Sequence, residues 1–194
     1  MPAGGILERR SRRGIAGGLP QLNPFTRFEQ AILPHLDAAY NLARWLTRND
    51  HDAVDVVQET YLRAWQHFGG FHGSDGRAWL MTIVRNTCYT FLERNRAHER
   101  TTTFDEDVHG STADAGNPER LLLQKEDQQV VRQALEALPV EFREVMVLRE
   151  LEGLSYKEIA GIVGIPLGTV MSRLARARDR LQQGLAPHLK KEDS

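Results

Sequence analysis

Apolar residues recur along most of the chain at steps of three and four, the spacing that gathers them on one face of an α-helix. No stretch of useful length alternates apolar and polar residues as a half-buried β-strand does. Proline and glycine separate the periodic stretches from one another. The expected helices cover residues 24–33, 36–46, 51–68, 77–96, 117–138, 142–152, 156–163 and 167–183. The sequence therefore predicts an all-α fold.

Composition changes over residues 97–116, which are acidic and contain almost no large apolar residue. Such a stretch predicts a flexible linker, because it cannot contribute to a core and its like charges repel one another. We therefore expect two small helical domains. The predicted segments are a disordered basic tail at 1–22, a first domain at 23–96, the linker at 97–116, a second domain at 117–186 and a tail at 187–194. The basic tail either touches nucleic acid or is an inert chain end.

The expected helix at 51–68 leads into a glycine-rich loop that carries aromatic residues. Its predicted buried stripe consists of Val54, Val57, Tyr61, Ala64 and Trp65. In the loop, Phe71 has two possible roles. It is either a plug that returns to the core or a platform on which an unstacked base can lie. The physics of the sequence favours the plug, since large aromatic residues are usually buried.

The last two expected helices form a compact unit. Ser155 and Glu158 have the spacing of a capping box, which predicts a helix start at Tyr156. Gly164 supplies a turn, and Pro166 prevents the first helix from continuing. The second helix has an apolar stripe of Val170, Leu174, Ala177 and Leu181 and a polar stripe of Thr169, Ser172, Arg173, Arg176 and Arg180. This pattern is typical of a DNA-reading helix-turn-helix, with an ordinary helical hairpin as the alternative.

Composition excludes several classes of protein. The 194 residues include one cysteine, Cys88, so neither a disulfide framework nor a cysteine zinc site is expected. The formal net charge is −1, so attraction to nucleic acid must come from local basic patches. No apolar run is long enough to cross a membrane, and a cytoplasmic protein without membrane insertion is expected. The seven histidines are scattered, and no catalytic constellation, cofactor motif or metal site is evident, so we expect no enzyme and no cofactor.

Several separated motifs carry a specific resemblance. They are Asp55-Val-Val-Gln-Glu-Thr-Tyr-Leu-Arg-Ala-Trp65, Arg77-Ala-Trp-Leu80 with Asn86, Leu138-Pro139, Leu154-Ser-Tyr-Lys-Glu-Ile-Ala160, Gly164-Ile-Pro-Leu-Gly-Thr-Val170 and Ser172-Arg-Leu174. Their order and spacing, from about Phe25 to Gln183, resemble those of the extracytoplasmic-function (group 4) sigma factors of bacteria. The resemblance implies a subunit that directs core RNA polymerase to promoter DNA. It implies that the two domains are sigma regions 2 and 4.

The resemblance also implies roles for individual residues. The polymerase clamp would be bound by Asp55, Gln58 and Glu59. The −10 element would be read and melted by Phe71, His72, Asn86 and Thr90. The −35 element would be contacted by Thr169, Met171, Ser172, Arg173, Arg176 and Arg178, with Ser172 and Arg176 on base edges and Arg173 and Arg178 on phosphates. An anti-sigma factor is the further partner that the family implies.

The chain departs from the family pattern at four positions. Met171 stands where a basic residue is usual, and Ala175 where a larger aromatic residue or histidine is common. Thr90 replaces a frequent Asp or Asn, and Glu93 a frequent Arg. These departures concern promoter preference. Met171 and Ala175 also lend support to an alternative, a sigma-like decoy that sequesters an anti-sigma factor without initiating transcription.

Overall fold

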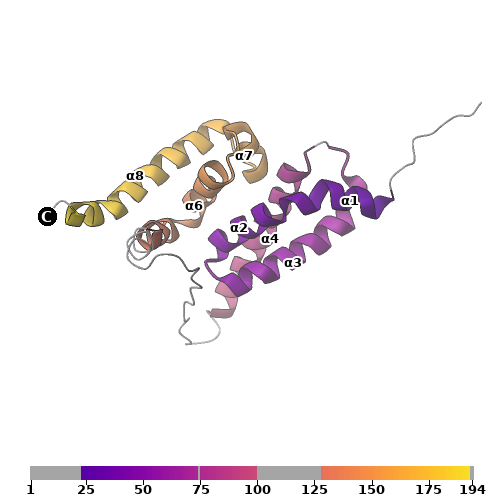
Figure 1. Cartoon of the computed structure of the whole chain (residues 1–194), viewed down its shortest axis with the longest axis horizontal. Helices are drawn as coiled ribbons and strands as arrows, with labels where there is room; N and C mark the ends of the chain where they lie inside the picture. Colours follow the sequence, from indigo (N-terminus) through magenta and orange to yellow (C-terminus); the bar gives the residue numbers. More distant parts are fainter. Residues whose placement is uncertain (1–22, 74, 100–127, 193–194) are drawn as a thin grey trace, which may run out of the picture.

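The computed structural model describes residues 23–73, 75–99 and 128–192, and these residues form two groups of helices (Figure 1). The first group comprises α1 (Pro24–Ile32), the 3-10 turn η1 (Leu33–His35), α2 (Leu36–Thr47), α3 (Asp50–His67), the 3-10 turn η2 (Phe68–Gly70) and α4 (Gly76–Glu99). The second comprises a helical segment at 128–136, α6 (Val140–Met146), the π-helical turn η3 (Val147–Leu151), α7 (Tyr156–Val163) and α8 (Leu167–Glu192). No strand occurs in the described ranges, and the all-α prediction is confirmed.

Local sequence signals account for several helix starts. The side chain of Asn23 accepts a hydrogen bond from the amide of Phe25, with Pro24 in the first turn. Asn49 caps α3 through the amides of His51 and Asp52. Each cap satisfies backbone donors that the first turn of a helix leaves unpaired.

Several predicted boundaries move. Helix α4 continues to Glu99, and α8 continues to Glu192, so the boundaries predicted at residues 96 and 186 fall inside helices. The predicted basic tail at 1–22 and residues 100–116 of the predicted linker lie outside the described residues. The predicted helix start at 117 also lies outside them, and the described part of that helix runs over 128–136.

The first domain has a core between α2, α3 and α4, which pack against one another. The predicted buried stripe of α3 is partly wrong, because Val54 is 43% exposed and Trp65 46% exposed. The residues of α3 that are buried are Ala53, Val56, Val57, Thr60 and Ala64. The helix is thus rotated relative to the prediction, and a small residue, Ala53, takes the core position that Val54 was expected to fill.

Aromatic rings connect α1 to the glycine-rich loop. Phe28 packs edge-on against Trp65 and Phe68, each with a ring-centroid distance of 5.2 Å. Phe68 stacks on Phe71 at 5.6 Å. Phe71 in turn lies 5.0 Å from Trp79 in α4. Contacts of this kind add stabilisation beyond burial of area, and they tie the loop to two helices.

The second domain is built on α6 and α8, with α7 packed against α8. Its buried apolar residues include Val145, Leu148, Ile159, Val170 and Leu174. The turn η3 interrupts the α-helical pattern, since the amide of Glu152 donates to the carbonyl of Val147 at 3.0 Å. The domains also touch each other, with α4 against α7 and α2 against α6 (Figure 1).

Gly76, the first residue of α4, lies against the backbone of α1. A Cβ at this position would collide with the backbone carbonyl of Ala31. Backbone cannot yield as a side-chain end can, so we expect Gly76→Ala to destabilise the first domain by about 1–3 kcal/mol. Thermal or denaturant unfolding would measure the loss.

Gly161→Ala provides a matched control for this prediction. Gly161 is exposed inside α7, and a Cβ there meets nothing within 4 Å. Alanine has a higher helix propensity than glycine, so this variant should be stabilised by about 0.5–1 kcal/mol. Equal stability of the Gly76→Ala variant and the wild-type protein would contradict the close approach of the two helices.

Candidate nucleic-acid interface

One face of α3 carries the residues predicted to bind polymerase. Asp55, Gln58 and Glu59 are all exposed, at spacings that place them on the same side of the helix. Glu59 forms an ion pair with Arg63 at 2.7 Å. Leu62 lies on this face and is 60% exposed. The structure therefore brings the three predicted residues together and adds an exposed apolar residue that the sequence analysis did not select.

The glycine-rich loop forms a shallow hollow of about 470 Å³ in front of α4. It is lined by Gly70, Phe71, His72, Gly73, Asp75 and Trp79. Phe71 is half-buried, since one part of its ring packs on Phe68 and Trp79 while the ring also borders the hollow. His72 is exposed. Phe71 can therefore pack against the core and still offer its ring to an unstacked base, because the packed ring borders an open space.

Asn86 lies about 15 Å along α4 from its start beside the loop, and Thr90 lies one turn further along the helix. Asn86 is exposed and Thr90 half-buried. The Thr90 hydroxyl donates to the Asn86 carbonyl at 2.9 Å. Arg85 donates from Nη1 to the side-chain oxygen of Asn86 at 3.3 Å, so Arg85 orients the amide that is predicted to read DNA.

The helix-turn-helix forms as predicted. The hydroxyl of Ser155 accepts from the amide of Glu158 while the Glu158 carboxylate accepts from the amide of Ser155, which completes the capping box. The hydrogen bonds to the Ser155 hydroxyl and amide hold the pKa of Glu158 below its usual value. Gly164 ends α7 in the left-handed conformation, with φ of 73°. Val170, Leu174 and Ala177 of α8 are buried, so the opposite face of α8 is directed outward.

The residues predicted to contact the −35 element do not all share this outward face. Met171, Ser172 and Arg176 are exposed, whereas Thr169 and Arg173 are half-buried. Arg178 pairs with Glu150 of η3 at 2.8 Å. This hydrogen-bonded pair raises the pKa of Arg178. Arg173 and Arg178 thus flank the exposed face on opposite sides.

A polar cluster joins α4 to α6 across the two domains. The carboxylate of Glu144 is fully buried and accepts from Arg85 Nε at 2.6 Å and from the Tyr89 hydroxyl at 3.2 Å. Burial raises the pKa of Glu144, although Arg85, Tyr89 and Arg173 counteract it. Burial and the charge of Glu144 raise the pKa of Tyr89 to about 12. Sequence analysis missed this cluster, since its members are far apart in the chain.

Two further polar groups connect the domains nearby. Arg77 donates to the Glu152 carboxylate and to the Glu152 carbonyl, each at 2.7 Å. Asn41 donates to the same carboxylate at 3.5 Å. Cys88 is buried in α4, and desolvation raises the pKa of its thiol to about 12, which keeps it in the unreactive thiol form.

Within the described ranges, no three His, Cys, Asp or Glu side chains are grouped so that they could hold a metal ion. No single helix in these ranges is long and apolar enough to cross a membrane. Helix α7 and residues 167–186 meet such a criterion only as a pair, and that pair is bent by 102°.

The chain matches two family models in succession. Residues 31–98 match the model of sigma-70 region 2, and residues 128–181 match the model of sigma-70 region 4. The first match covers α2, α3 and α4, and the second covers the helices from residue 128 into α8. The order on the chain is that of the two predicted domains.

Curated relatives agree with these matches. The ECF RNA polymerase sigma factor SigE of Mycolicibacterium smegmatis is 35% identical over 161 residues, which make up 83% of this chain and 62% of that relative. The chain thus spans less than two thirds of that protein's length. The ECF RNA polymerase sigma-E factor of Escherichia coli K12 is 35% identical over 147 residues, or 72% of this chain and 77% of the relative.

Solved structures resemble the fold as well. The sigma factor RpoE of Bartonella quintana, in complex with the anti-sigma factor NepR, superposes with a TM-score of 0.70 at 33% identity, covering 83% of this chain and 98% of that one. CnrH, in complex with the cytosolic domain of CnrY, gives a TM-score of 0.56 at 28% identity, with coverages of 88% and 91%. The chain belongs to the extracytoplasmic-function group of the sigma-70 family of RNA polymerase sigma factors.

Proposed function

We propose that this protein binds core RNA polymerase in the cytoplasm and directs it to promoters, reading the −10 element with region 2 and the −35 element with region 4. The observation that carries the proposal is that one chain presents the exposed α3 face, the aromatic loop and the exposed face of α8. A repressor that only bound duplex DNA would need the last of these alone.

The α3 face suits a protein partner. Asp55, Gln58 and Glu59 can accept hydrogen bonds from basic and polar groups of the polymerase clamp. Val54 and Leu62 are 43% and 60% exposed on or beside this face and supply apolar area. Apolar anchors surrounded by polar groups are common in protein interfaces. The acidic character also favours polymerase over DNA as the ligand of this surface.

The hollow beside Phe71 suits an unstacked base of the −10 element. Stacking on an aromatic ring is worth about 1–3 kcal/mol per base. Extruding a base from the duplex costs a few kcal/mol. A single aromatic pocket with added contacts from His72, Asn86 and Thr90 can therefore offset strand separation without an external energy source.

The outward face of α8 suits the major groove at the −35 element. Arg176 can donate two hydrogen bonds to a guanine edge, and Ser172 can donate or accept. Met171 and Thr169 offer apolar contact to thymine methyl groups. Arg173 and Arg178 flank the helix, where phosphates would lie.

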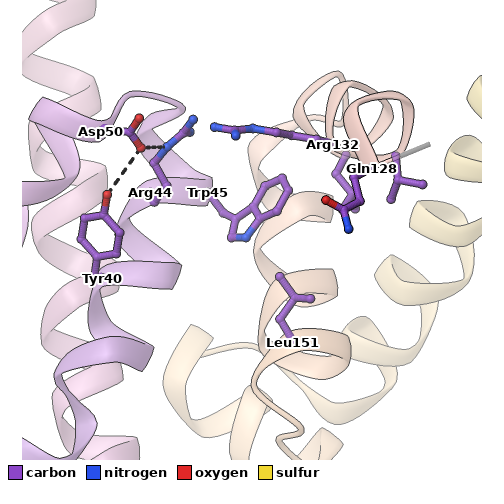
Figure 2. A pocket seen from close by; sticks show the side chains of 9 residues that line it. Tyr40, Arg44, Trp45, Asp50, Gln128, Arg132 and Leu151 are labelled. Atoms are coloured by element: carbon purple, nitrogen blue, oxygen red, sulfur yellow. Dashed lines mark hydrogen bonds and ion pairs between the residues drawn. The ribbon is translucent and has the colours of Figure 1, made fainter. Parts of the chain in front are cut away.

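An anti-sigma factor is the regulatory partner that we propose. The sigma factor RpoE of Bartonella quintana, which is 33% identical to this chain, was solved with the anti-sigma factor NepR bound. A groove of about 550 Å³ runs between α2 and residues 128–135 (Figure 2). It is lined by Tyr40, Arg44, Trp45, Asp50, Gln128, Val131, Arg132, Leu135 and Leu151. The apolar residues of its walls suit the apolar face of an amphipathic helix, while Arg44 and Arg132 are already paired with Asp50 and Glu136.

The alternative is a decoy that binds an anti-sigma factor and does not initiate transcription. Met171 and Ala175 favour it, because they remove side chains that usually contact DNA. Two features favour the initiation factor, since a decoy would need neither the polymerase-binding face nor the DNA-binding face. They are the exposed pair Gln58 and Glu59, and the exposed Arg176.

Run-off transcription on pooled genomic fragments separates these possibilities. We expect the protein, added to core RNA polymerase, to produce transcripts from a restricted set of fragments that share a −35 and a −10 motif. Stable binding to core polymerase without transcripts from any fragment would favour the decoy. Loss of core binding in an Asp55→Ala, Glu59→Ala double variant that retains its thermal stability would support the α3 face.

Arg176→Ala should reduce discrimination at one position of the −35 element by about 1–3 kcal/mol, because a base-edge contact is removed. Binding of duplex −35 DNA and of single-base variants would measure it. Arg178→Ala is the matched control. Arg178 already has an ion-pair partner, and its loss should weaken the binding of all DNA sequences equally. An equal loss for every sequence in the Arg176→Ala variant would make Arg176 a phosphate contact instead.

Phe71→Leu should leave binding of duplex −35 DNA intact and slow open-complex formation, because leucine retains apolar packing but offers no ring face for stacking. Phe71→Trp is expected to retain opening. Fluorescence of a base analogue in the −10 element would measure the rate. If Phe71→Leu opens promoters at the wild-type rate while Phe71→Ala lowers the thermal stability, Phe71 is a core plug only.

A further inference from the structure

The contact between the two domains covers a face of α4, the helix on which Asn86 and Thr90 lie. Glu144 of α6 is the centre of this contact. Its side chain has no exposed area, and its two oxygens are divided between Arg85 and Tyr89 at 2.6 and 3.2 Å. Both partners are on α4 and are half-buried. A carboxylate of the second domain therefore occupies hydrogen-bond donors of the first.

Arg85, which binds Glu144 here, is also placed where it could bind DNA. It neighbours Asn86 in sequence and donates to the Asn86 side chain at 3.3 Å. Its guanidinium also lies 4.4 Å from the centre of the Tyr89 ring. Guanidinium groups bind carboxylates and phosphates with the same planar set of donors. The Arg85 and Tyr89 donors that hold the Glu144 carboxylate can therefore also bind a phosphate.

A positive charge from the other DNA-facing helix reaches the same cluster. Arg173 of α8 is half-buried, and its positive charge opposes the rise that burial causes in the pKa of Glu144 and of Tyr89. Glu144 is therefore paired with an arginine of α4 and also lies within the electrostatic influence of an arginine of α8, the two helices that we propose to read promoter DNA. A single buried carboxylate neutralises part of both surfaces while the domains are in contact.

We propose that Glu144 is a latch that stands in for a DNA phosphate, and that Arg85 exchanges this carboxylate for the phosphate backbone when the domains separate on DNA. The inference rests on the proposed function, since it takes α4 and α8 to be the DNA-reading helices. It adds Arg85 and Tyr89 to the residues that face DNA. In the closed form the chain withholds these residues, and in the open form Glu144 is returned to water.

The physics of a buried ion pair fits a latch of this kind. Removing a carboxylate from water is costly, and only good geometry with charged partners offsets it. Burial raises the pKa of Glu144, and Arg85 and Tyr89 act against that rise. Breaking the pair by removing one partner is strongly unfavourable, whereas separating the domains returns both charges to water or to DNA. The buried pair thus fixes how the two domains dock, and it still allows them to separate.

The distance between the domains tests the latch directly. Gln66 of α3 and Gln182 of α8 are exposed, and cysteines placed there can carry a fluorophore pair in the full-length chain. Cys88 is buried and will not compete for the label. In the Glu144→Gln variant we expect the ratio of open to closed molecules to rise by about tenfold or more, because the amide keeps the size of the carboxylate but not its charge.

Two comparisons keep this test independent of folding. Arg85→Gln should open the chain as Glu144→Gln does, although it alters a half-buried residue of the other domain. Glu150→Gln is the matched control, since it breaks an arginine pair within the second domain and should leave the distance unchanged. Thermal unfolding of each variant shows whether the domains remain folded.

Duplex DNA of mixed sequence tests the exchange. Added to the wild-type protein, it should shift the distance toward that of the Glu144→Gln variant, and salt should reverse the shift. An unchanged distance in both the Glu144→Gln and the Arg85→Gln variant overturns the latch. Opening of the variants without any effect of DNA on the wild-type protein overturns the exchange. Neither result depends on polymerase, so a failure of run-off transcription is distinguishable from a failure of the latch.

Discussion

The packing of α4 is the constraint on which most of this structure depends. One side of the helix, with Leu80, Val84 and Cys88 fully buried, completes the core of the first domain. Another side contacts α7 and accommodates Glu144 of α6. The residues that remain outward, such as Asn86, are those that no other helix requires. A helix shared in this way cannot rotate to suit one neighbour without losing another, and this fixes the direction of its exposed polar groups.

The loop before α4 likewise combines packing against the core with an exposed surface. Phe71 is held by Phe68 and Trp79, yet it borders an open hollow. An aromatic ring that is immobilised on one face and accessible at the other loses little freedom when a base stacks on it. Preorganisation of this kind favours binding because the cost of ordering is met during folding.

Local signals in the sequence were sufficient to predict where most helices lie and to predict the helix-turn-helix, but not where α4 and α8 end. The caps at Asn23, Asn49 and Ser155 act within a few residues, so their effect can be read from the sequence. The buried face of α3 was harder to predict, because Val54 and Trp65 fit an apolar face as well as Ala53 and Thr60 do. Tertiary packing decides between such faces, and it selected the smaller residues where α2 and α4 approach. The Glu144 cluster had no local signal, since its arginine partner is 59 residues away in the chain.

The turn η3 has a consequence for the register between the domains. A π-helical turn accommodates one more residue than an α-helical turn, and each residue turns an α-helix by about 100°. Everything after Val147 is therefore rotated relative to α6 by the presence of that residue. Glu150 then meets Arg178, Leu151 borders the groove, and Glu152 reaches Arg77. The extra residue of the π-helical turn thus directs three consecutive side chains to three different neighbours. The two glutamates meet arginines, and the leucine lines an apolar wall.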